Sequence, residues 1–244
     1  MKGIVFVGPT LAGREIKPGS DIVLHPPAAQ GDLYRAALGK ARAIGLIDGV
    51  FETVPSVWHK EILFALSRGI RVYGAASMGA LRAAELHPFG MTGIGKIFRD
   101  YRSGRIESDD AVAVLHAPRE EGFRQLSEAL VDMRATLQVA VRARVVSRTT
   151  ASDLERIASA TFFKDRNWRR IMNLARTDDL PKHQLLRLTE WLPDNRVEQK
   201  CRDGLALIAT MRRQLTRRAP AFRPRFTFQH TAFWQAVVDP NGRA

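Results

Sequence analysis

A serine flanked by small residues is the strongest candidate for a chemically active side chain in this sequence. Residues 74–79 read GAASMG, an apolar run precedes them, and a helix-like run follows. A tight turn from a strand into a helix needs small neighbours, because the flanking backbones approach closely, and such a turn exposes the serine hydroxyl. Ala75 replaces the first glycine of the Gly-x-Ser-x-Gly pattern. The stretch therefore predicts a nucleophile at Ser77, in a relaxed form of the motif.

Backbone N–H groups near Ser77 are expected to stabilise the anion that forms when a serine attacks an acyl group. The helix after Ser77 begins with unpaired N–H groups, and its dipole favours negative charge at that end. A second donor is expected from the loop that follows the first predicted strand. The expected oxyanion and substrate-binding residues are Gly8, Pro9, Thr10, Met78 and Gly79.

A serine nucleophile needs a base, and His59 is the best candidate. It falls in the first turn of a predicted helix, at the same end of the sheet as Ser77. Asp48 and Glu52, in the preceding loop, are expected to orient its imidazole ring. The chain order acid–His–Ser differs from the order Ser–acid–His of the α/β-hydrolases, which removes support from that fold but does not exclude a triad.

These residues also have purely structural interpretations, which the sequence leaves open. Ser77 can cap the helix that follows it, a common role for serine at this position. His59 can be a solvent-facing helix residue, and His25 and His116 can be polar residues at strand ends. A metal site is not expected, because the histidines lack the spacing that brings several ligands together.

The remaining motifs argue against a cofactor site, and none is predicted. The loop GPTLAG at 8–13 lacks the Gly-Lys-Ser/Thr ending of a phosphate-binding loop. The single cysteine, Cys201, cannot form a disulfide within the chain or a Cys-rich zinc site. We expect it to be a buried, small apolar residue.

Short apolar runs that alternate with helical patterns must position these residues. The predicted strands are 2–8, 21–25, 44–51, 70–75 and 111–116, and the predicted helices between them are 31–43, 56–69, 77–86 and 93–104. Strands separated by helices imply parallel pairing. The expected fold is therefore α/β, an open, mostly parallel sheet with flanking helices in flavodoxin- or Rossmann-like layers. Ligands bind beyond the carboxyl ends of such strands, so the loop before 111–116, at the other edge, is excluded from the predicted site, whereas His116, at the end of that strand, is not.

The second half of the chain shows helical patterns only. We expect a core domain over residues 1–120 and a basic, all-α extension over residues 121–244. The net charge of +13 is concentrated there, because residues 117–244 hold 24 Lys and Arg against 14 Asp and Glu, a net of +10. Such an excess attracts nucleic acid or an acidic protein or peptide, or it is a solvated helical face. No apolar run approaches the roughly 20 residues of a membrane helix, and the first residues do not resemble a signal peptide. We expect a cytoplasmic protein without membrane contacts.

Seven segments together resemble one family, the TfuA-like proteins. They are GPTL at 8–11, PPAAQGDLYRA at 26–36, IGLIDGVFE at 44–52, VWHKEIL at 57–63, GAASMGALRAAEL at 74–86, GMTGIGKIF at 90–98 and DDAVAVLHAP at 109–118. The resemblance covers about the first 120 residues. The helical second half is then expected to be an extension specific to a subgroup.

The resemblance implies an accessory role beside a YcaO enzyme, which uses ATP to install thioamides in the backbone of ribosomally made peptides. It further implies that this protein supplies sulfur, by liberating sulfide from the C-terminal thiocarboxylate of a ThiS-like carrier protein. Expected partners are thus a YcaO-type enzyme, the sulfur carrier and the precursor peptide. The alternative is a non-enzymatic adaptor that binds the YcaO enzyme and delivers the sulfur donor. Nucleic-acid binding ranks third, because residues 117–244 contain no recognised nucleic-acid motif.

The residue chemistry fits a hydrolysis of this kind. A thiocarboxylate is an acyl group, so acyl transfer to Ser77 would expel sulfide, and water would then release the carrier. A mouth lined by glycine and alanine suits a thin, extended tail. Cys201 lies outside the resembling segments, which argues against a persulfide relay. Carriers of this kind are often acidic, so the arginine-rich half could help to dock one.

Overall fold

Five short parallel strands form the centre of the molecule. The structure is a computed structural model that describes residues 2–17, 19–39, 41–50, 54–217, 221–232 and 234–235. The strands are β1 (Gly3–Phe6), β2 (Ile22–His25), β3 (Ala43–Leu46), β4 (Arg71–Ala75) and β5 (Thr92–Ile94), in the order β2-β1-β3-β4-β5. All four pairings are parallel, which confirms the predicted α/β class. This is the doubly wound order in which ligands bind between β1 and β3, where the chain reverses its direction along the sheet.

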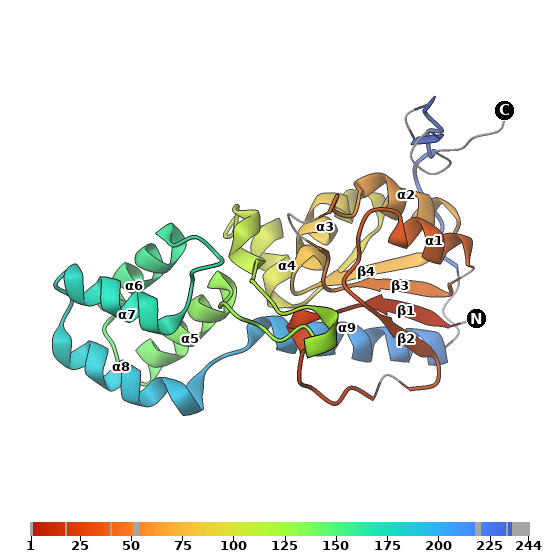
Figure 1. Cartoon of the computed structure of the whole chain (residues 1–244). Helices are drawn as coiled ribbons and strands as arrows, with labels where there is room; N and C mark the ends of the chain where they lie inside the picture. The colour runs from red at the N-terminus through yellow and green to blue at the C-terminus, as the bar shows by residue number, and fades with distance from the viewer. Residues whose placement is uncertain are drawn as a thin grey trace.

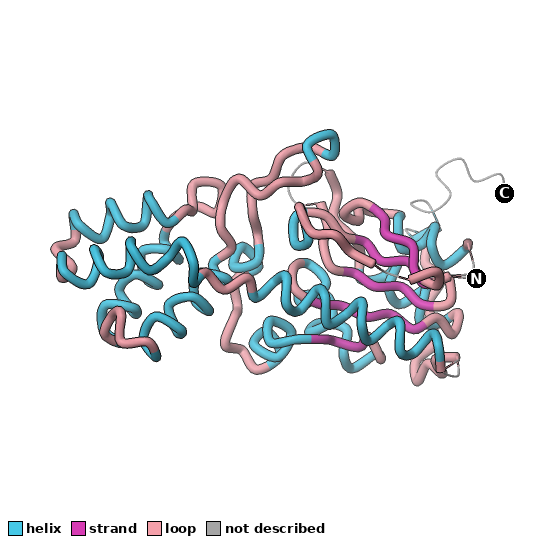
Figure 2. Tube along the Cα trace, turned by 90° about the horizontal axis from the view of Figure 1, so that it is seen from below, coloured by secondary structure: helices cyan, strands magenta, loops and turns pink. Residues whose placement is uncertain are grey.

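Helices cover both faces of this sheet, as the runs of apolar residues in its strands require. On one face, α1 (Asp32–Leu38), α2 (His59–Ser67) and α3 (Met78–Leu86) pack onto side chains such as Phe6 and Leu46. On the other face, α9 (Gln199–Thr216) packs onto alternate residues of the same strands, such as Val5 and Tyr73. Figure 1 shows α9 beneath the strands, and Figure 2, seen from below, shows it in front of them.

Four helices lie beside the sheet and form what we call the helical unit. They are α5 (Leu130–Arg142), α6 (Arg148–Ala160), α7 (Trp168–Thr177) and α8 (Lys182–Asn195), and they stand apart from the strands in Figure 1. α4 (Gly95–Arg102) lies between them and α3. The second half of the chain is helical, as predicted, but its last helix, α9, belongs to the layer on the sheet. The predicted domain boundary near residue 120, between the core domain and the helical extension, therefore stays a prediction. Among the described residues, none of the helices has both the length and the apolar composition needed to cross a membrane.

The C-terminal segment returns to the far side of the sheet and packs along α2. The Phe222 N–H donates to the Gly69 carbonyl, 2.9 Å away. Trp234 is buried against the ring of Tyr34, and Lys60 lies over the Trp234 ring. The aromatic residues near the end of the sequence thus complete the outer surface of the α1–α2 layer.

The prediction of the last strand, residues 111–116, is wrong. Asp109–Val112 form a 3₁₀ helix instead, and His116 makes only one isolated antiparallel bridge, with Gln125. The fifth strand is β5, which falls where the helix 93–104 was predicted to begin. β5 ends at Ile94, and α4 begins at Gly95, whose φ of +95° favours glycine. Ala111 and Val112, the buried residues of this run, lie in the 3₁₀ helix that contacts α3 and α5, whereas Leu115 is exposed.

The start of α3 packs so closely on β3 that Gly79 has no room for a side chain. A Cβ at this position would lie 1.8 Å from the Leu46 carbonyl oxygen. We expect Gly79→Ala to lower the free energy of unfolding by about 3 kcal/mol, because the backbones must separate. Gly39→Ala is the matched control, since its Cβ would meet only ordinary contacts, 3.5 Å and beyond. Urea unfolding measures both, and equal stabilities would contradict the close packing.

Candidate functional site

The backbone is strained immediately before Ser77. The Ser77 N–H donates to the Ala75 carbonyl, 2.8 Å away, which closes a three-residue turn between β4 and α3. Ala76, in the middle of this turn, has a φ of +66°, a region that L-residues with side chains avoid. Such a conformation costs of order 1–3 kcal/mol and occurs most often at active sites and ligand clamps. The predicted strand-to-helix turn is thus present, and its geometry marks Ser77 as a functional candidate.

Ser77 does not act as the cap of α3, although it occupies the N-cap position. Its side chain accepts no hydrogen bond from the first turn of the helix. Within the described residues, no hydrogen bond of the Ser77 hydroxyl is found either. The side chain is partly exposed and lines a cavity. The capping interpretation therefore does not explain this serine.

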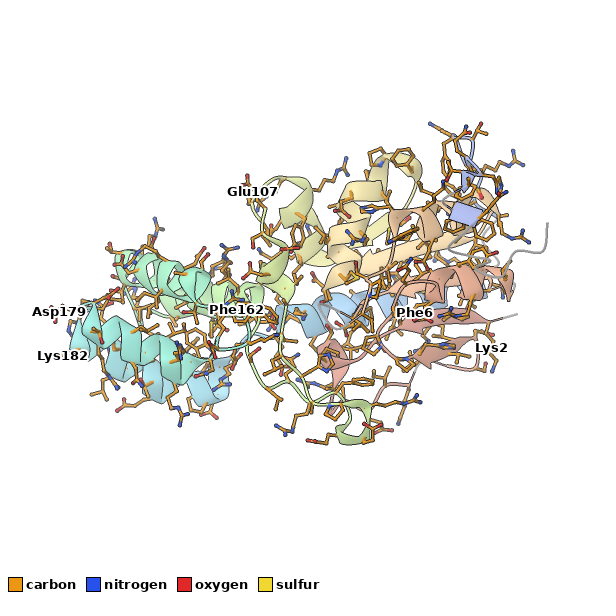
Figure 3. All side chains as sticks on the ribbon, turned by 45° about the horizontal axis from the view of Figure 1, so that its top comes forward. Lys2, Phe6, Glu107, Phe162, Asp179 and Lys182 are labelled. Atoms are coloured by element: carbon orange, nitrogen blue, oxygen red, sulfur yellow. The ribbon has the colours of Figure 1, made fainter. Side chains whose placement is uncertain are left out.

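The cavity at Ser77 measures about 570 Å³ and lies beyond the carboxyl ends of β3 and β4. Ser77 and Met78 form part of one wall, and residues 48–50 after β3 form another. The opposite wall consists of residues 107–109 and 112–116, together with Phe163 and Lys164 from the helical unit. Figure 3 labels Glu107 and Phe162, which mark these two contributing segments. The segment before residue 111, which the sequence argument excluded, is therefore part of the cavity, because 111–116 is not an edge strand.

His59, the predicted base, is not among the residues that line this cavity. Its Nε2 atom lies 2.7 Å from Glu85 Oε2, and Arg82 Nη1 donates to the same oxygen at 2.8 Å. Burial alone would raise the pKa of Glu85, but the hydrogen bonds from His59 and Arg82 together lower it. His59 thus forms part of a charged cluster at the cavity rim, where Arg82 and Glu85 are the lining residues.

His116 lines the same cavity as Ser77. Its Nδ1 atom lies 2.8 Å from the Ala117 carbonyl oxygen, which can only accept a hydrogen bond. Nδ1 must therefore carry the proton, so Nε2 of the neutral ring is left as an acceptor, the form that a general base requires. The Phe123 ring packs edge-on against the imidazole, with the ring centroids 5.8 Å apart. His116, which was not excluded from the predicted site but was ranked behind His59, thus lies in the cavity with Ser77.

The buried carboxylate of Asp48 fixes the loop after β1 rather than an imidazole. Asp48 is 1% exposed, and it accepts hydrogen bonds from the Gly8 and Thr10 N–H groups at 2.9 and 3.0 Å. The Thr10 hydroxyl donates to its other oxygen at 2.6 Å. This cluster fills the point between β1 and β3 where the chain reverses. Glu52, the second predicted orienting acid, lies outside the described residues.

Most of the predicted oxyanion donors have other partners. Asp48 occupies the N–H groups of Gly8 and Thr10, and the Gly79 N–H donates to the Ile47 carbonyl at 3.2 Å. Pro9 has no N–H, although it lines the cavity. The Met78 N–H has no hydrogen-bond partner in the described part of the chain, and it stands at the positive end of α3. Met78 is thus the predicted donor that the structure leaves available.

A buried arginine ties the helical unit to the cavity wall. Arg166 is fully buried, and its Nη2 atom donates to Asp110 Oδ2 at 2.7 Å. Further hydrogen bonds run from the same guanidinium to the carbonyls of Asp110, Ala158 and Thr161. Asp110 belongs to the 3₁₀ helix beside the lining residues 112–116. The arginine therefore holds this wall in place over Ser77.

A buried lysine supports the same wall from α9. Lys200 is 1% exposed, and its Nζ atom donates to the Val112 carbonyl at 2.7 Å. Burial lowers the pKa of Lys200, and the charges of Asp48 and Asp132 oppose this shift. Neither Lys200, in α9, nor Arg166, in the loop between α6 and α7, could be singled out from the sequence, because nothing in a local pattern marks a basic residue as buried.

The ion pair between Asp110 and Arg166 leads to a prediction of how the stability of the protein depends on pH. Burial alone would raise the pKa of Asp110, but hydrogen bonds from Ser108 and Arg166 lower it. A carboxyl with a lowered folded pKa stabilises the protein above its unfolded pKa, and this contribution is lost as the pH falls through the folded pKa. We expect Asp110→Asn to destabilise the protein by about 1–3 kcal/mol at neutral pH and by progressively less below about pH 4. Urea unfolding across this range tests the prediction, which a pH-independent difference would contradict.

No three His, Cys, Asp or Glu side chains in the described ranges are arranged to hold a metal ion.

In a comparison with known families, residues 48–167 fit the model described as TfuA-like protein. No curated protein matches the sequence. The matched segment begins at Asp48 and ends just after Arg166, so it contains Ser77 and His116. It extends through α6, further than the first 120 residues of the expected resemblance, but it does not include residues 1–47, where the resembling segments 8–11 and 26–36 lie.

Proposed function

On the premise that this chain is a TfuA-like protein, as its residues 48–167 show, we propose that it releases sulfide for a YcaO-type enzyme. The family places the chain as an accessory protein of the YcaO-associated system. The proposed reaction is hydrolysis of the C-terminal thiocarboxylate of a ThiS-like carrier. The sulfide would serve the thioamidation of a peptide backbone by the YcaO enzyme.

In the proposed mechanism, Ser77 attacks the carbonyl carbon of the thiocarboxylate. His116 Nε2 accepts the hydroxyl proton, and the Met78 N–H stabilises the oxyanion. His116 passes this proton to the sulfur as the C–S bond breaks, hydrosulfide leaves, and the carrier is held on Ser77 as an ester. Water, activated by His116, attacks this ester and releases the carrier with an ordinary carboxylate, which restores the serine. His116 replaces His59 as the proposed base, because His59 does not line the cavity and its Nε2 atom pairs with Glu85 at the cavity rim.

One observation carries this proposal: a serine hydroxyl and a histidine Nε2 atom, both without a hydrogen-bond partner among the described residues, line the same cavity. The strained turn at Ala76 and the start of α3 supply the setting that nucleophilic serines use. Small residues of the lining, such as Gly49 and Ala113, leave room for a narrow peptide tail.

The direct test combines sulfide release with covalent labelling. The purified full chain is mixed with a thiocarboxylated ThiS-like carrier, and sulfide is measured against a sample without protein. A fluorophosphonate probe is added in parallel, and mass spectrometry locates the adduct. We expect sulfide release and an adduct on the peptide that contains Ser77. Thioamidation that depends on this protein without either signal would favour the adaptor alternative.

A further inference from the structure

The helical unit has a large groove that the proposed reaction does not use. It measures about 820 Å³, and all of its lining residues come from α5 and α6. Its lining is apolar at Leu137 and Val141 of α5 and at Ala151 of α6. Leu137 and Ala151 are buried, whereas Val141 remains partly exposed. The groove lies away from the cavity of Ser77, with which it shares no lining residue.

Small side chains of α6 create the space. Ala151, Ser152, Ser159 and Ala160 recur at intervals that place them on one side of a helix, and all four line the groove. Each helix has 13 residues, so the groove runs alongside about 20 Å of helix. This length matches three to four turns of a partner helix. An amphipathic helix that binds in a groove uses apolar residues at the same intervals.

The rims of the groove are strongly basic. Its lining contains four arginines against the single carboxylate of Glu155, which pairs with Arg134 at 2.8 Å. Arg156 reaches Asp178, outside the lining, at 3.4 Å. Arg142 and Arg148 form no ion pair with any described residue. Their uncompensated charges flank an apolar surface, an arrangement that favours a negatively charged, partly apolar ligand.

We propose that the α5–α6 groove binds an acidic, amphipathic helix of a partner protein. The apolar side of that helix packs on Leu137, Val141 and Ala151, and its carboxylates pair with Arg142 and Arg148. Single-stranded nucleic acid fits less well, because proteins bind it with aromatic side chains that stack on the bases, and this lining has none. The site is independent of Ser77.

The test uses a defined peptide. An 18-residue, fluorescein-labelled helix with Leu at positions i, i+3, i+4 and i+7 and Glu elsewhere is titrated with the full chain, and fluorescence anisotropy gives Kd. We expect binding that weakens as salt is added. A version with Lys in place of Glu, and one broken by a central proline, should each bind at least about tenfold more weakly. Absence of binding by the Glu peptide at low salt would overturn the proposal.

Matched variants locate the site. The double variant Arg142→Glu/Arg148→Glu should weaken binding of the Glu peptide by about tenfold or more. The double variant Arg169→Glu/Arg187→Glu, at exposed positions of α7 and α8, makes the same change in charge and should leave Kd within about twofold. Ser159→Trp fills the groove without a change in charge and should also weaken binding. Equal effects of the two charge reversals, or displacement of the peptide by an equimolar single-stranded oligonucleotide, would overturn it.

Discussion

Ser77→Ala is expected to reduce sulfide release from a thiocarboxylated carrier by at least about a thousandfold. In the proposed mechanism the hydroxyl oxygen forms the covalent bond to the carrier, so no other group can replace it, and serine hydrolases lose comparable or larger factors on this change. The fold should be unaffected. The side chain is partly exposed, caps no helix, and makes no hydrogen bond within the described residues. The measurement is the initial rate of sulfide formation under single-turnover conditions.

Ser67→Ala provides the matched control for this change. Ser67 lies at the end of α2, its hydroxyl donates to the Phe64 carbonyl, and it is not part of the cavity lining. Its rate should stay within about twofold of wild type, since surface substitutions seldom change stability by more than about 0.5 kcal/mol. Circular dichroism and urea unfolding establish that both variants are folded. A folded Ser77→Ala protein with an unchanged rate would rule out the covalent mechanism.

The second large effect is expected at His116 rather than at His59. His116→Ala should lower the rate of sulfide release by about 10²–10⁴-fold, the usual contribution of a positioned general base. His59→Ala should change it by less than about threefold, because the ring pairs with Glu85 in an exposed cluster, where an ion pair contributes little. Both variants remove an imidazole, so each is the control for the other. A large loss of rate in His59→Ala alone would show that the loops rearrange on substrate binding and would return the base to the residue predicted from the sequence.

The strands and helices with a clear local pattern could be predicted from the sequence alone. The first four strands, the helices that pack on them and the turn at Ser77 follow from apolar spacing, from breaking residues and from small side chains over short stretches. The parallel pairing of the strands could be predicted as well, because helical connections between strands leave few alternatives. The strand predicted for the run AVAVLH at 111–116 is wrong, because a short apolar run can be buried in a sheet or against helices and its pattern does not distinguish the two.

The contacts between side chains that are far apart in the sequence became known only from the tertiary structure. Asp48 binds the N–H of Gly8, 40 residues away, and Lys200 supports the Val112 carbonyl across 88 residues. The contact of Arg166 with Asp110 spans 56 residues and fixes the wall that contains His116. Such contacts depend on how separate elements pack, and a pattern of neighbouring residues carries no information about them. The candidate nucleophile could therefore be proposed from its own turn, whereas the proposed base depends on a loop whose position is set by helices elsewhere in the chain.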